Sequence, residues 1–331
     1  MRIISNLKKL AVLCFVTTAI ISCNNDDYVA PLPVDNSIAG IASRDAQFTV
    51  LVDALSRAGL VNTLKGTGPF TVFAPTNTAF NAFLTANGFA NLDAVPVPLL
   101  KEILLNHVVS GAVQSTALTT GYIKTLAKGS ASSTNTLSMY VNTANNGVRL
   151  NGVSGVTTPN ILATNGVIHV VNAVIGLPTI VTHTVANPNF EKLKLLVTSP
   201  AQSAVLAALS GSGPLTVFAP LNAAVDAATG SGGFASGASD AAVTRVLQYH
   251  VVAGNNLAAS LVDNTDITSV ANQPGSTTVF QTLKVFTSAP LGPRLQDKAT
   301  APNNISKIVA TDVQCSNGVI HAVDKVLQPN L

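Results

Sequence analysis

The sequence predicts an α+β fold built twice in tandem, and three repeated blocks are the observations that predict it. TGPFTVFAPTNTAF at 67–80 returns as SGPLTVFAPLNAAV at 212–225, and ILLNHVVSG at 103–111 returns as VLQYHVVAG at 246–254. TNGVIHVV at 164–171 returns as SNGVIHAV at 316–323, in the same order along the chain. The copies lie 143 to 152 residues apart, which is the size of a whole domain and not of a solenoid repeat. We therefore predict two domains of one fold, at 37–178 and 180–329.

The first 22 residues have the pattern of a signal peptide. Three basic residues precede LAVLCFVTTAII, a run of 12 apolar or small residues that is too short to span a bilayer comfortably. The run ends at Ser22-Cys23, which resembles the lipobox of bacterial lipoproteins, in which the cysteine is cleaved free and acylated. We expect Cys23 to be the lipidation site; the alternative is an ordinary secretory signal with an incidental cysteine.

Residues 23–36 have the composition of a flexible tether. The stretch CNNDDYVAPLPVDN is polar, acidic and proline-bearing, and it would separate a lipid anchor from a folded body. Acidic residues directly after an acylated cysteine resemble the surface-export signal of some Gram-negative lineages. We therefore expect an outer membrane lipoprotein, exposed at the cell surface, that meets the membrane through an acyl anchor at Cys23.

The net charge changes when the signal peptide is removed. The whole chain has 18 Lys and Arg residues against 15 Asp and Glu residues, but the first 22 residues contain three of the basic ones and no acidic one. The remaining chain has 15 of each, and it carries no basic stripe interleaved with aromatic residues. The composition therefore argues against a nucleic-acid partner.

Helices are predicted in the first half of each copy. In FTVLVDALSRAGL, Phe48, Leu51, Val52 and Leu55 fall on one helical face. The segment VPLLKEILLNHVV repeats this spacing, and its apolar face ends at His107, as the matching face of the second copy ends at His250. A neutral core histidine with both ring nitrogens hydrogen-bonded explains this position. The alternative, a metal site, would need further ligands nearby.

The block TVFAPTNTAF predicts a strand that leads into a helix. Phe70 to Phe73 is a β-branched and aromatic run that Pro75 ends, and Thr76 or Asn77 could then cap a helix that starts near Ala79. Asn222 stands at the matching place of the second copy. The alternative role for these asparagines is contact with a ligand.

The second half of each copy is predicted to be rich in β-strands. Thr-, Asn- and Gly-rich alternating segments indicate hairpins, and the NGVIH block indicates a tight turn followed by a final strand that His169 and His321 lock to the body. Helices followed by strands favour α+β over a doubly wound sheet. The second copy has 71 residues between its histidines against 62 in the first, and the extra length around ANQPGSTTVF and APLGPRLQDK is where we expect its own specificity.

Cysteine use and missing motifs limit the chemistry. Cys14 would leave with the signal peptide and Cys23 would be acylated, so Cys315 has no disulfide partner, and a cysteine zinc site is excluded by count. Cys315 is expected to be a buried, inert thiol, the alternative being a nucleophile. The chain has no G-x-S-x-G, H-E-x-x-H, P-loop or dinucleotide fingerprint.

The three blocks in this order resemble the fasciclin family, and the two copies of the resemblance cover nearly all of 37–329. The resemblance implies a compact wedge of two β-sheets with helices packed around it, duplicated in tandem. It also implies a role in cell adhesion or extracellular-matrix contact, without a cofactor.

In animal members of this family, partner contact is credited to a Tyr-His segment and to an Asp-Ile pair before the last strand. The second copy matches the first feature with Tyr249-His250 and approximates the second with Asp312-Val313. These four residues are the candidate partner-contact residues. The first copy departs from both features, with Asn106 before His107 and Asn160-Ile161 in place of the pair.

Three functions are compatible with these features. The first is a non-enzymatic, lipid-anchored adhesion protein that binds a cell-surface or matrix protein or glycan. The second is a polysaccharide-capturing accessory lipoprotein for nutrient uptake, although the chain has no Trp and only four Tyr for stacking on sugars. The third is a hydrolase, which the sequence disfavours because every histidine except His183, on the linker, lies in an apolar block.

Overall fold

The structure is a computed structural model of the whole chain, and it describes residues 34–144, 147–233, 235–288, 290, 292–301 and 304–331. The expected signal peptide at 1–22, the lipidation site Cys23 and most of the tether at 23–36 lie outside these residues. The chain from Asp35 onward forms one compact unit. Among the described residues no single helix is long and apolar enough to cross a membrane; one pair, Pro188–Val197 with Pro200–Ser210, passes only jointly, across a bend of 78°.

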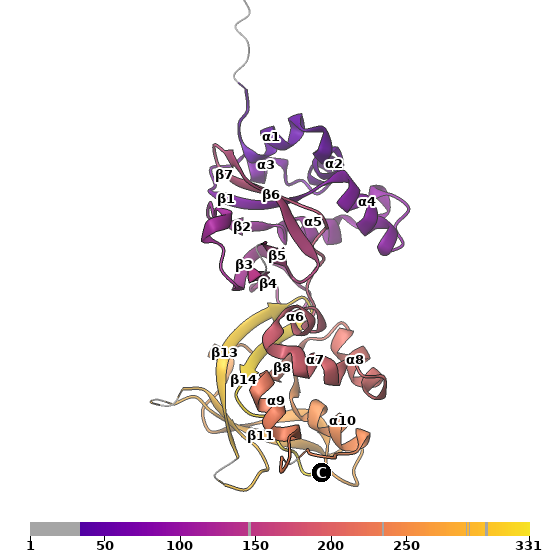
Figure 1. Cartoon of the computed structure of the whole chain (residues 1–331), viewed down its shortest axis with the longest axis vertical. Coiled ribbons are helices and arrows are strands. Elements are labelled where there is room, and N and C mark those ends of the chain that lie inside the picture. Colours follow the sequence, from indigo (N-terminus) through magenta and orange to yellow (C-terminus); the bar gives the residue numbers. More distant parts are fainter. Residues whose placement is uncertain (1–33, 145–146, 234, 289, 291, 302–303) are drawn as a thin grey trace, which may run out of the picture. The chain divides into compact units, whose positions relative to one another are not determined.

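The same series of helices and strands occurs twice along the chain (Figure 1). The first copy consists of α1 (Ile38–Arg44), α2 (Thr49–Arg57), α3 (Val61–Lys65), β1 (Phe70–Pro75), α4 (Asn77–Ala86), α5 (Val97–Leu105), β2 (Val108–Ser110), β3 (Gly121–Lys128), β4 (Thr136–Asn142), β5 (Arg149–Leu150), β6 (Ser154–Ala163) and β7 (Gly166–Val171). The second copy consists of α6 (Ile180–Ala186), α7 (Glu191–Val197), α8 (Ser203–Ser210), β8 (Leu215–Pro220), α9 (Asn222–Thr229), α10 (Asp240–Tyr249), β9 (Val251–Ala253), β10 (Thr265–Asn272), β11 (Phe280–Phe286), β12 (Arg294–Gln296), β13 (Ile305–Cys315) and β14 (Gly318–Val323).

The strands of each copy form two sheets that share one long strand. In the first copy the order is β2-β1-β7-β6-β5-β4-β3, with β1 parallel to β7 and the other neighbours antiparallel. Strand β6 changes register between Val156 and Thr158 and again before Ile161, and such bulges bend a strand so that it can serve both sheets. In the second copy the order β10-β11-β12-β13-β14-β8-β9 closes into a barrel. The predicted α+β wedge of two sheets, duplicated in tandem, is confirmed.

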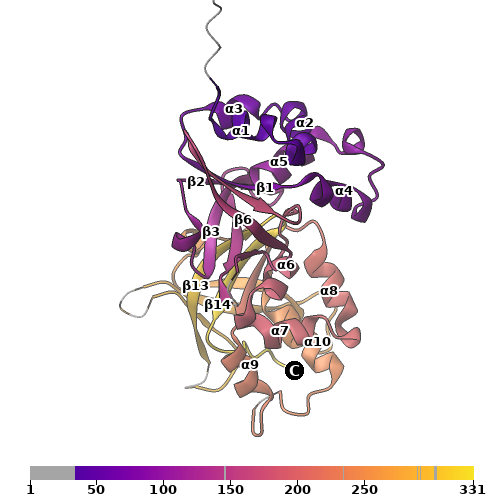
Figure 2. The same ribbon diagram turned by 45° about the horizontal axis from the view of Figure 1, so that its top comes forward.

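Alternation along β1 explains how the layers of the first copy are held together. Val72 and Ala74 belong to a core cluster with the apolar faces of helices α1 to α5, which gather beside β1 in Figure 2. Phe73 points the other way, into a cluster with Met139 and Val141 of β4. The sheet containing β1 and β7 is therefore buried on both faces, between the helices and the second sheet.

The repeated Asn-Gly pair joins the last strand to the first helix and first strand. The Asn165 side chain accepts the N–H of Ile38 at 2.9 Å and donates to the carbonyl of Leu64 at 2.8 Å, and Asn317 makes the corresponding bonds in the second copy. Gly166 has φ of 152°, and a Cβ there would lie 1.9 Å from the Phe70 carbonyl oxygen. Only glycine fits this position, which explains why the pair is copied with the scaffold.

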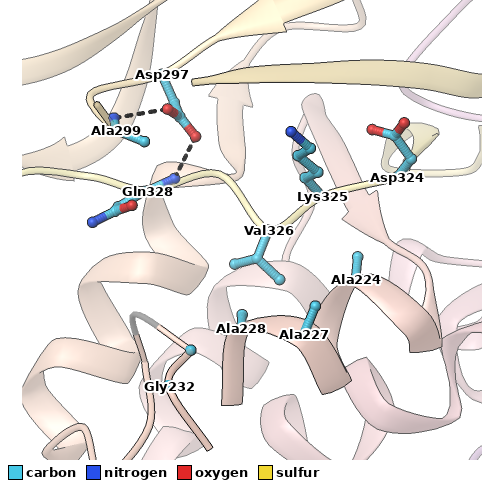
Figure 3. Close-up of a pocket in the computed structure, with 11 residues that line it drawn as sticks. Ala224, Ala227, Ala228, Gly232, Asp297, Ala299, Asp324, Lys325, Val326 and Gln328 are labelled. Atoms are coloured by element: carbon cyan, nitrogen blue, oxygen red, sulfur yellow. Dashed lines mark hydrogen bonds between the residues drawn. The ribbon is translucent and has the colours of Figure 1, made fainter. Parts of the chain in front are cut away.

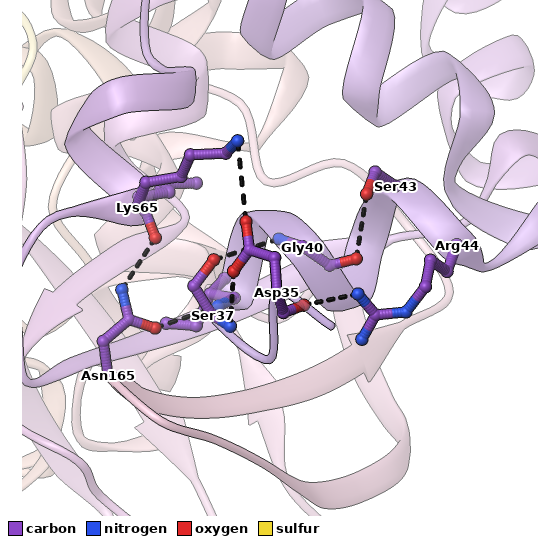
Figure 4. A network of polar contacts seen from close by, with 9 residues as sticks. Asp35, Ser37, Gly40, Ser43, Arg44, Lys65 and Asn165 are labelled. Carbon is purple, nitrogen blue, oxygen red and sulfur yellow. Dashed lines mark hydrogen bonds and ion pairs between the residues drawn. The ribbon is translucent and has the colours of Figure 1, made fainter. Parts of the chain in front are cut away.

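A polar network fixes the start of α1 (Figure 4). The Ser37 hydroxyl caps the helix by accepting the N–H of Gly40 at 3.1 Å, and the Ser37 N–H donates to Asp35 at 3.0 Å. Asp35 also pairs with Lys65 at 3.5 Å, and Arg44 donates to the Asp35 carbonyl. The network ties the segment before α1 to α1 itself and to the end of α3.

The two copies contact each other through β3 and β4 of the first and through α6 and β13 of the second. The backbone N–H of Gln314 donates to the Ser138 hydroxyl at 3.0 Å, and Asn187 donates to the Tyr122 hydroxyl at 3.1 Å. The Tyr122 ring meets the His183 ring edge-on, with centroids 5.2 Å apart. We call this contact region the seam.

Candidate functional site

His107 and His250 occupy matching positions between a helix and a strand, as the sequence predicts. In each, Nδ1 bonds a carbonyl one helical turn back: His107 to Ile103 at 2.8 Å, and His250 to Val246 at 2.7 Å. In each, Nε2 accepts a backbone N–H from the segment after the last strand, from Ile175 at 2.9 Å in the first copy and from Leu327 at 2.8 Å in the second. Nδ1 must therefore carry the proton in both rings.

His169 and His321 adopt the opposite tautomer. Their Nε2 atoms bond the carbonyls of Val113 at 2.9 Å and Asn256 at 2.8 Å, so these nitrogens carry the proton. Their Nδ1 atoms accept the N–H of Asn160 at 3.2 Å and of Asp312 at 3.4 Å. Each of the two rings stacks on the phenylalanine of the neighbouring parallel strand.

The repeated imidazoles are therefore unsuited to acid–base or metal chemistry. Burial lowers the pKa of His107 and of His250 to about 4, against the smaller opposing effect of the helix carbonyl that each bonds. Burial also lowers the pKa of His169 and His321. With both nitrogens bonded to backbone, neither a substrate proton nor an ion has a free lone pair to reach. Over the described part of the chain, no three His, Cys, Asp or Glu side chains could together hold a metal ion.

His183 is the exception to this bonding pattern. It lies on α6, within the seam, and neither ring nitrogen has a hydrogen-bond partner although the side chain is fully buried. Burial is the largest cause that lowers the pKa of His183 to about 3; the Ser138 backbone opposes this shift and Lys124 adds to it. The ring stays neutral and packs as an aromatic group against Tyr122.

The structure places the four candidate contact residues inside the second copy or at the seam. Tyr249 and His250 are buried, and the Tyr249 hydroxyl donates to the Thr282 carbonyl at 2.8 Å. Val313 is also buried, in the core cluster of the helices. Asp312 is half-buried; its carboxylate accepts the N–H of Ala258 at 2.8 Å and its carbonyl accepts Lys124 from the first copy.

Each of the four residues has a structural contact of its own. Asp312 has φ of 62°, a left-handed conformation that aspartate tolerates, and its N–H reaches His321. Contact with a partner through these side chains stays a prediction, and in this conformation only Asp312 is partly open to solvent.

Cys315 is a buried free thiol, as expected from its position beside the last turn. Burial raises the pKa of the Cys315 thiol, and nearby Lys124 opposes this only in part. The thiol therefore remains protonated and unreactive at neutral pH.

A cleft in the second copy was not predicted from the sequence. It has a volume of about 390 Å³ and lies between α9 and the segment after β14 (Figure 3). Alanines 224, 227 and 228 of α9 form one wall, and Val326 points toward them. Asp297, Asp324 and Lys325 line the opposite side.

On the polar side of this cleft, the Asp297 carboxylate already accepts hydrogen bonds from the backbone of the same domain. The Asp297 carboxylate accepts the N–H groups of Ala299 and Gln328, both at 2.8 Å, and burial nonetheless raises the pKa of that carboxyl. One difference in the sequence could have indicated the cleft, namely a smaller side chain in the second copy. Ala228 stands where the first copy has Phe83, which packs against its core.

Comparisons with known proteins agree with the duplicated fold. The model of the Fasciclin domain matches residues 46–178 and again 188–329. Protein sll1483 of Synechocystis is 34% identical over 142 residues, which cover 43% of this chain and 74% of that protein. Human periostin is 27% identical over 303 residues, which cover 91% of this chain but 33% of periostin.

Among solved structures, a FAS1 domain pair from the insect cell adhesion molecule Fasciclin I matches 88% of this chain and 95% of its own, at 16% identity and a TM-score of 0.44. The two matches to the family model cover most of the chain and coincide with the two structural copies. The chain belongs to the fasciclin domain family, of which it carries two domains in tandem.

Proposed function

We propose that this chain is a non-enzymatic adhesion protein, anchored at the outer surface of the cell through an acylated Cys23, that binds a cell-surface or matrix protein or glycan. The anchor would hold one end of the chain while the two domains present their surfaces to a partner. The two fasciclin domains at 46–178 and 188–329 support this proposal, because the resemblance to that family implies a role in adhesion or matrix contact.

The state of the repeated histidines is the observation that carries this proposal. All four repeated imidazoles have both nitrogens bonded to the backbone of their own domain. A hydrolase that relies on one of these histidines would need it free to act as a base toward a nucleophile. The duplicated blocks thus serve the scaffold, and the exposed surface is left for function.

Gene deletion and surface labelling test the proposal together. Cells that lack the protein should attach less to surfaces and form less biofilm, and wild-type protein should incorporate radiolabelled fatty acid and be cleaved by protease added outside. The Cys23→Ala variant should lose the label. Unchanged attachment after deletion, with no binding of purified protein to any cell-surface polymer, contradicts the proposal.

The cleft of the second domain favours one alternative, a polysaccharide-capturing accessory lipoprotein for nutrient uptake. Its alanine wall could accept the apolar face of a sugar ring, and Asp324 and Lys325 could bond hydroxyl groups. A glycan array separates the two functions: short, soluble oligosaccharides bound in the cleft would favour capture. Weakened binding of those oligosaccharides by Ala228→Phe would locate them there.

A further inference from the structure

The outer face of the second barrel carries a group of cations. Strands β11, β12 and β13 alternate buried and outward residues, and the outward ones include Lys284, Phe286, Arg294, Gln296 and Lys307. Lys298, just after β12, reaches the same face, since its Nζ lies 3.5 Å from the Thr282 hydroxyl. We call these six residues the basic face.

Two of these cations oppose each other directly. Arg294 of β12 is paired with Lys307 of β13, so both side chains leave the same side of the sheet. Like charges in this position destabilise a sheet. Among the described residues, neither has a carboxylate within salt-bridge distance, and only Lys284 of the basic face has one, Asp266 at 3.2 Å. The fold itself gives no reason for this pair.

The Arg294 guanidinium is positioned by an aromatic ring of the neighbouring strand. It lies over the Phe286 ring, 5.7 Å from the centroid, and its buried Nε has no hydrogen-bond partner. The carboxylate of Asp263 is nearby but accepts the N–H groups of Thr287 and Ser288. Stacking on an aromatic ring fixes the plane of a guanidinium and leaves its terminal N–H groups free for an outside acceptor.

On the matching face the first domain keeps Arg149 at the place of Arg294 but has no lysine at the places of Lys284 and Lys307. The β3–β4 pair aligns with β10–β11 because Thr125 and Ser269 each donate to the carbonyl of the facing strand. This alignment puts Tyr140 opposite Tyr122, in the seam, where the second domain has Lys284 opposite Asp266.

The position of Lys307 is likewise taken by Gly155, opposite Arg149. One face of the fold is thus aromatic in the first domain, where it packs on the second copy, and basic in the second domain.

We propose that the basic face binds a linear polysaccharide that carries carboxylate or sulfate groups. The inference rests on the proposed adhesion function and names the chemical class of its partner. Neighbouring strands lie about 4.8 Å apart and alternate residues about 7 Å apart, so the cations form a row that a polymer with regularly spaced anions can follow. The partner is held by charge, which does not need the exposed Trp or Tyr residues that neutral-sugar binding usually uses.

Neutral groups between the cations favour a polysaccharide over a nucleic acid. Gln296 lies opposite Lys284, and Thr282 lies two residues from it on the same face. Amide and hydroxyl groups at these places bond sugar hydroxyls, which a phosphodiester backbone supplies more sparsely.

Binding of the full-length protein, purified in mild detergent, to alginate tests the proposal, with neutral dextran as the reference polymer. Wild type should bind alginate with an affinity that falls as salt rises, and should not bind dextran. The triple variant Lys284→Gln, Arg294→Gln, Lys307→Gln should lose roughly ten- to hundredfold in affinity, because each exposed charge pair contributes a factor of about two to five.

Two further variants control for net charge and folding. Lys65→Gln, Lys101→Gln, Lys128→Gln removes the same charge from exposed positions of the first domain and should bind as wild type does. Asp266→Asn removes the acid that pairs with Lys284 and should strengthen binding. Equal losses in both triple variants, tighter binding of duplex DNA or of phosphatidylglycerol vesicles than of alginate, or binding of dextran as tight as that of alginate overturns the proposal.

Cell attachment separates this inference from the proposed function. If the basic-face variant no longer binds alginate and its cells no longer attach to alginate-coated surfaces, both stand. If purified protein binds alginate through the basic face but deletion leaves attachment unchanged, adhesion fails and the binding assignment stands. If deletion abolishes attachment while the basic-face variant attaches and binds as wild type does, only the inference fails.

Discussion

At the scale of single residues, the histidines define what this protein is built for. A histidine with both nitrogens bonded to backbone fixes two chain segments to each other and cannot accept a further proton without losing one bond. The chain uses this device at four positions, and it adds a fifth imidazole, His183, as a neutral ring in the seam.

Burial of neutral histidines makes stability depend on pH. The folded-state pKa of His107 and His250 is about 4 and that of His183 about 3, against 6.5 in the unfolded chain. Below pH 6.5 the unfolded state binds more protons, so stability is fully present above that pH and is lost as pH falls. Each of these three histidines should therefore lower the free energy of unfolding by about 2 kcal/mol between pH 7 and pH 5.

Urea denaturation at pH 7, 6 and 5 measures this loss. His107→Gln should be less stable at pH 7 but should show a shallower decrease toward pH 5, since one of the titrating groups is gone. A free energy of unfolding that stays constant between pH 7 and pH 5 would contradict the buried, neutral state.

At the scale of elements, short polar signals decide where helices begin. Thr76 caps α4 by accepting the N–H of Ala79 at 3.3 Å. Asn77, the other candidate, bonds Val50 and Ala46 and so ties α4 to the α2 region. Asn222 makes the same kind of link in the second domain, to Lys192 and Pro188, so the expectation that it caps α9 was wrong.

Thr76→Ala should cost about 1 kcal/mol of unfolding free energy, because the first turn of α4 would lose its side-chain acceptor. Thr78→Ala is the matched control: Thr78 is exposed on the same turn and caps nothing, so its removal should be neutral within about 0.5 kcal/mol. Chemical denaturation of both variants checks the difference. An equal effect of the two substitutions would argue against the cap.

These elements show what the sequence could and could not predict. The spacing that ends at His107 predicted a helix face and a core imidazole, since both depend on neighbours within one turn. Whether Thr76 or Asn77 caps the helix could not be decided, because both side chains offer an oxygen at nearly the same place. The basic face was anticipated only in part. The segment APLGPRLQDK, which contains Arg294, was expected to carry specificity, but Lys284 and Lys307 lie on neighbouring strands, and only the register brings the three together.

At the scale of the whole molecule, the seam joins two copies of one fold. It does so through aromatic side chains that the second copy lacks at the matching positions. The repeat was evident from sequence, but its contact surface was not, since Tyr122 and Tyr140 lie on separate strands whose pairing the turns determine. Their rings are 5.0 Å apart, and Tyr122 also packs against the helix core of the second domain. The matching Asp266–Lys284 pair is a solvated ion pair without such a contact.

The seam should make the two domains unfold together. Calorimetry of wild type should show one transition, whereas Tyr122→Ala, which removes the ring packed on His183 and the hydroxyl bonded to Asn187, should separate it into two. Asp266→Ala, at the matching place of the second domain, should leave one transition. Two transitions in wild type, or one in Tyr122→Ala, would contradict a stabilising seam.

The central claim is that the repeated histidines hold the scaffold and perform no chemistry, and nitrogen NMR of ¹⁵N-histidine-labelled protein tests it most directly. The claim predicts that His107 and His250 stay neutral down to pH 5 with the proton on Nδ1. It predicts that His169 and His321 carry the proton on Nε2 and have a lowered pKa. A repeated histidine that titrates near pH 6.5, or that exchanges between tautomers at neutral pH, would contradict it.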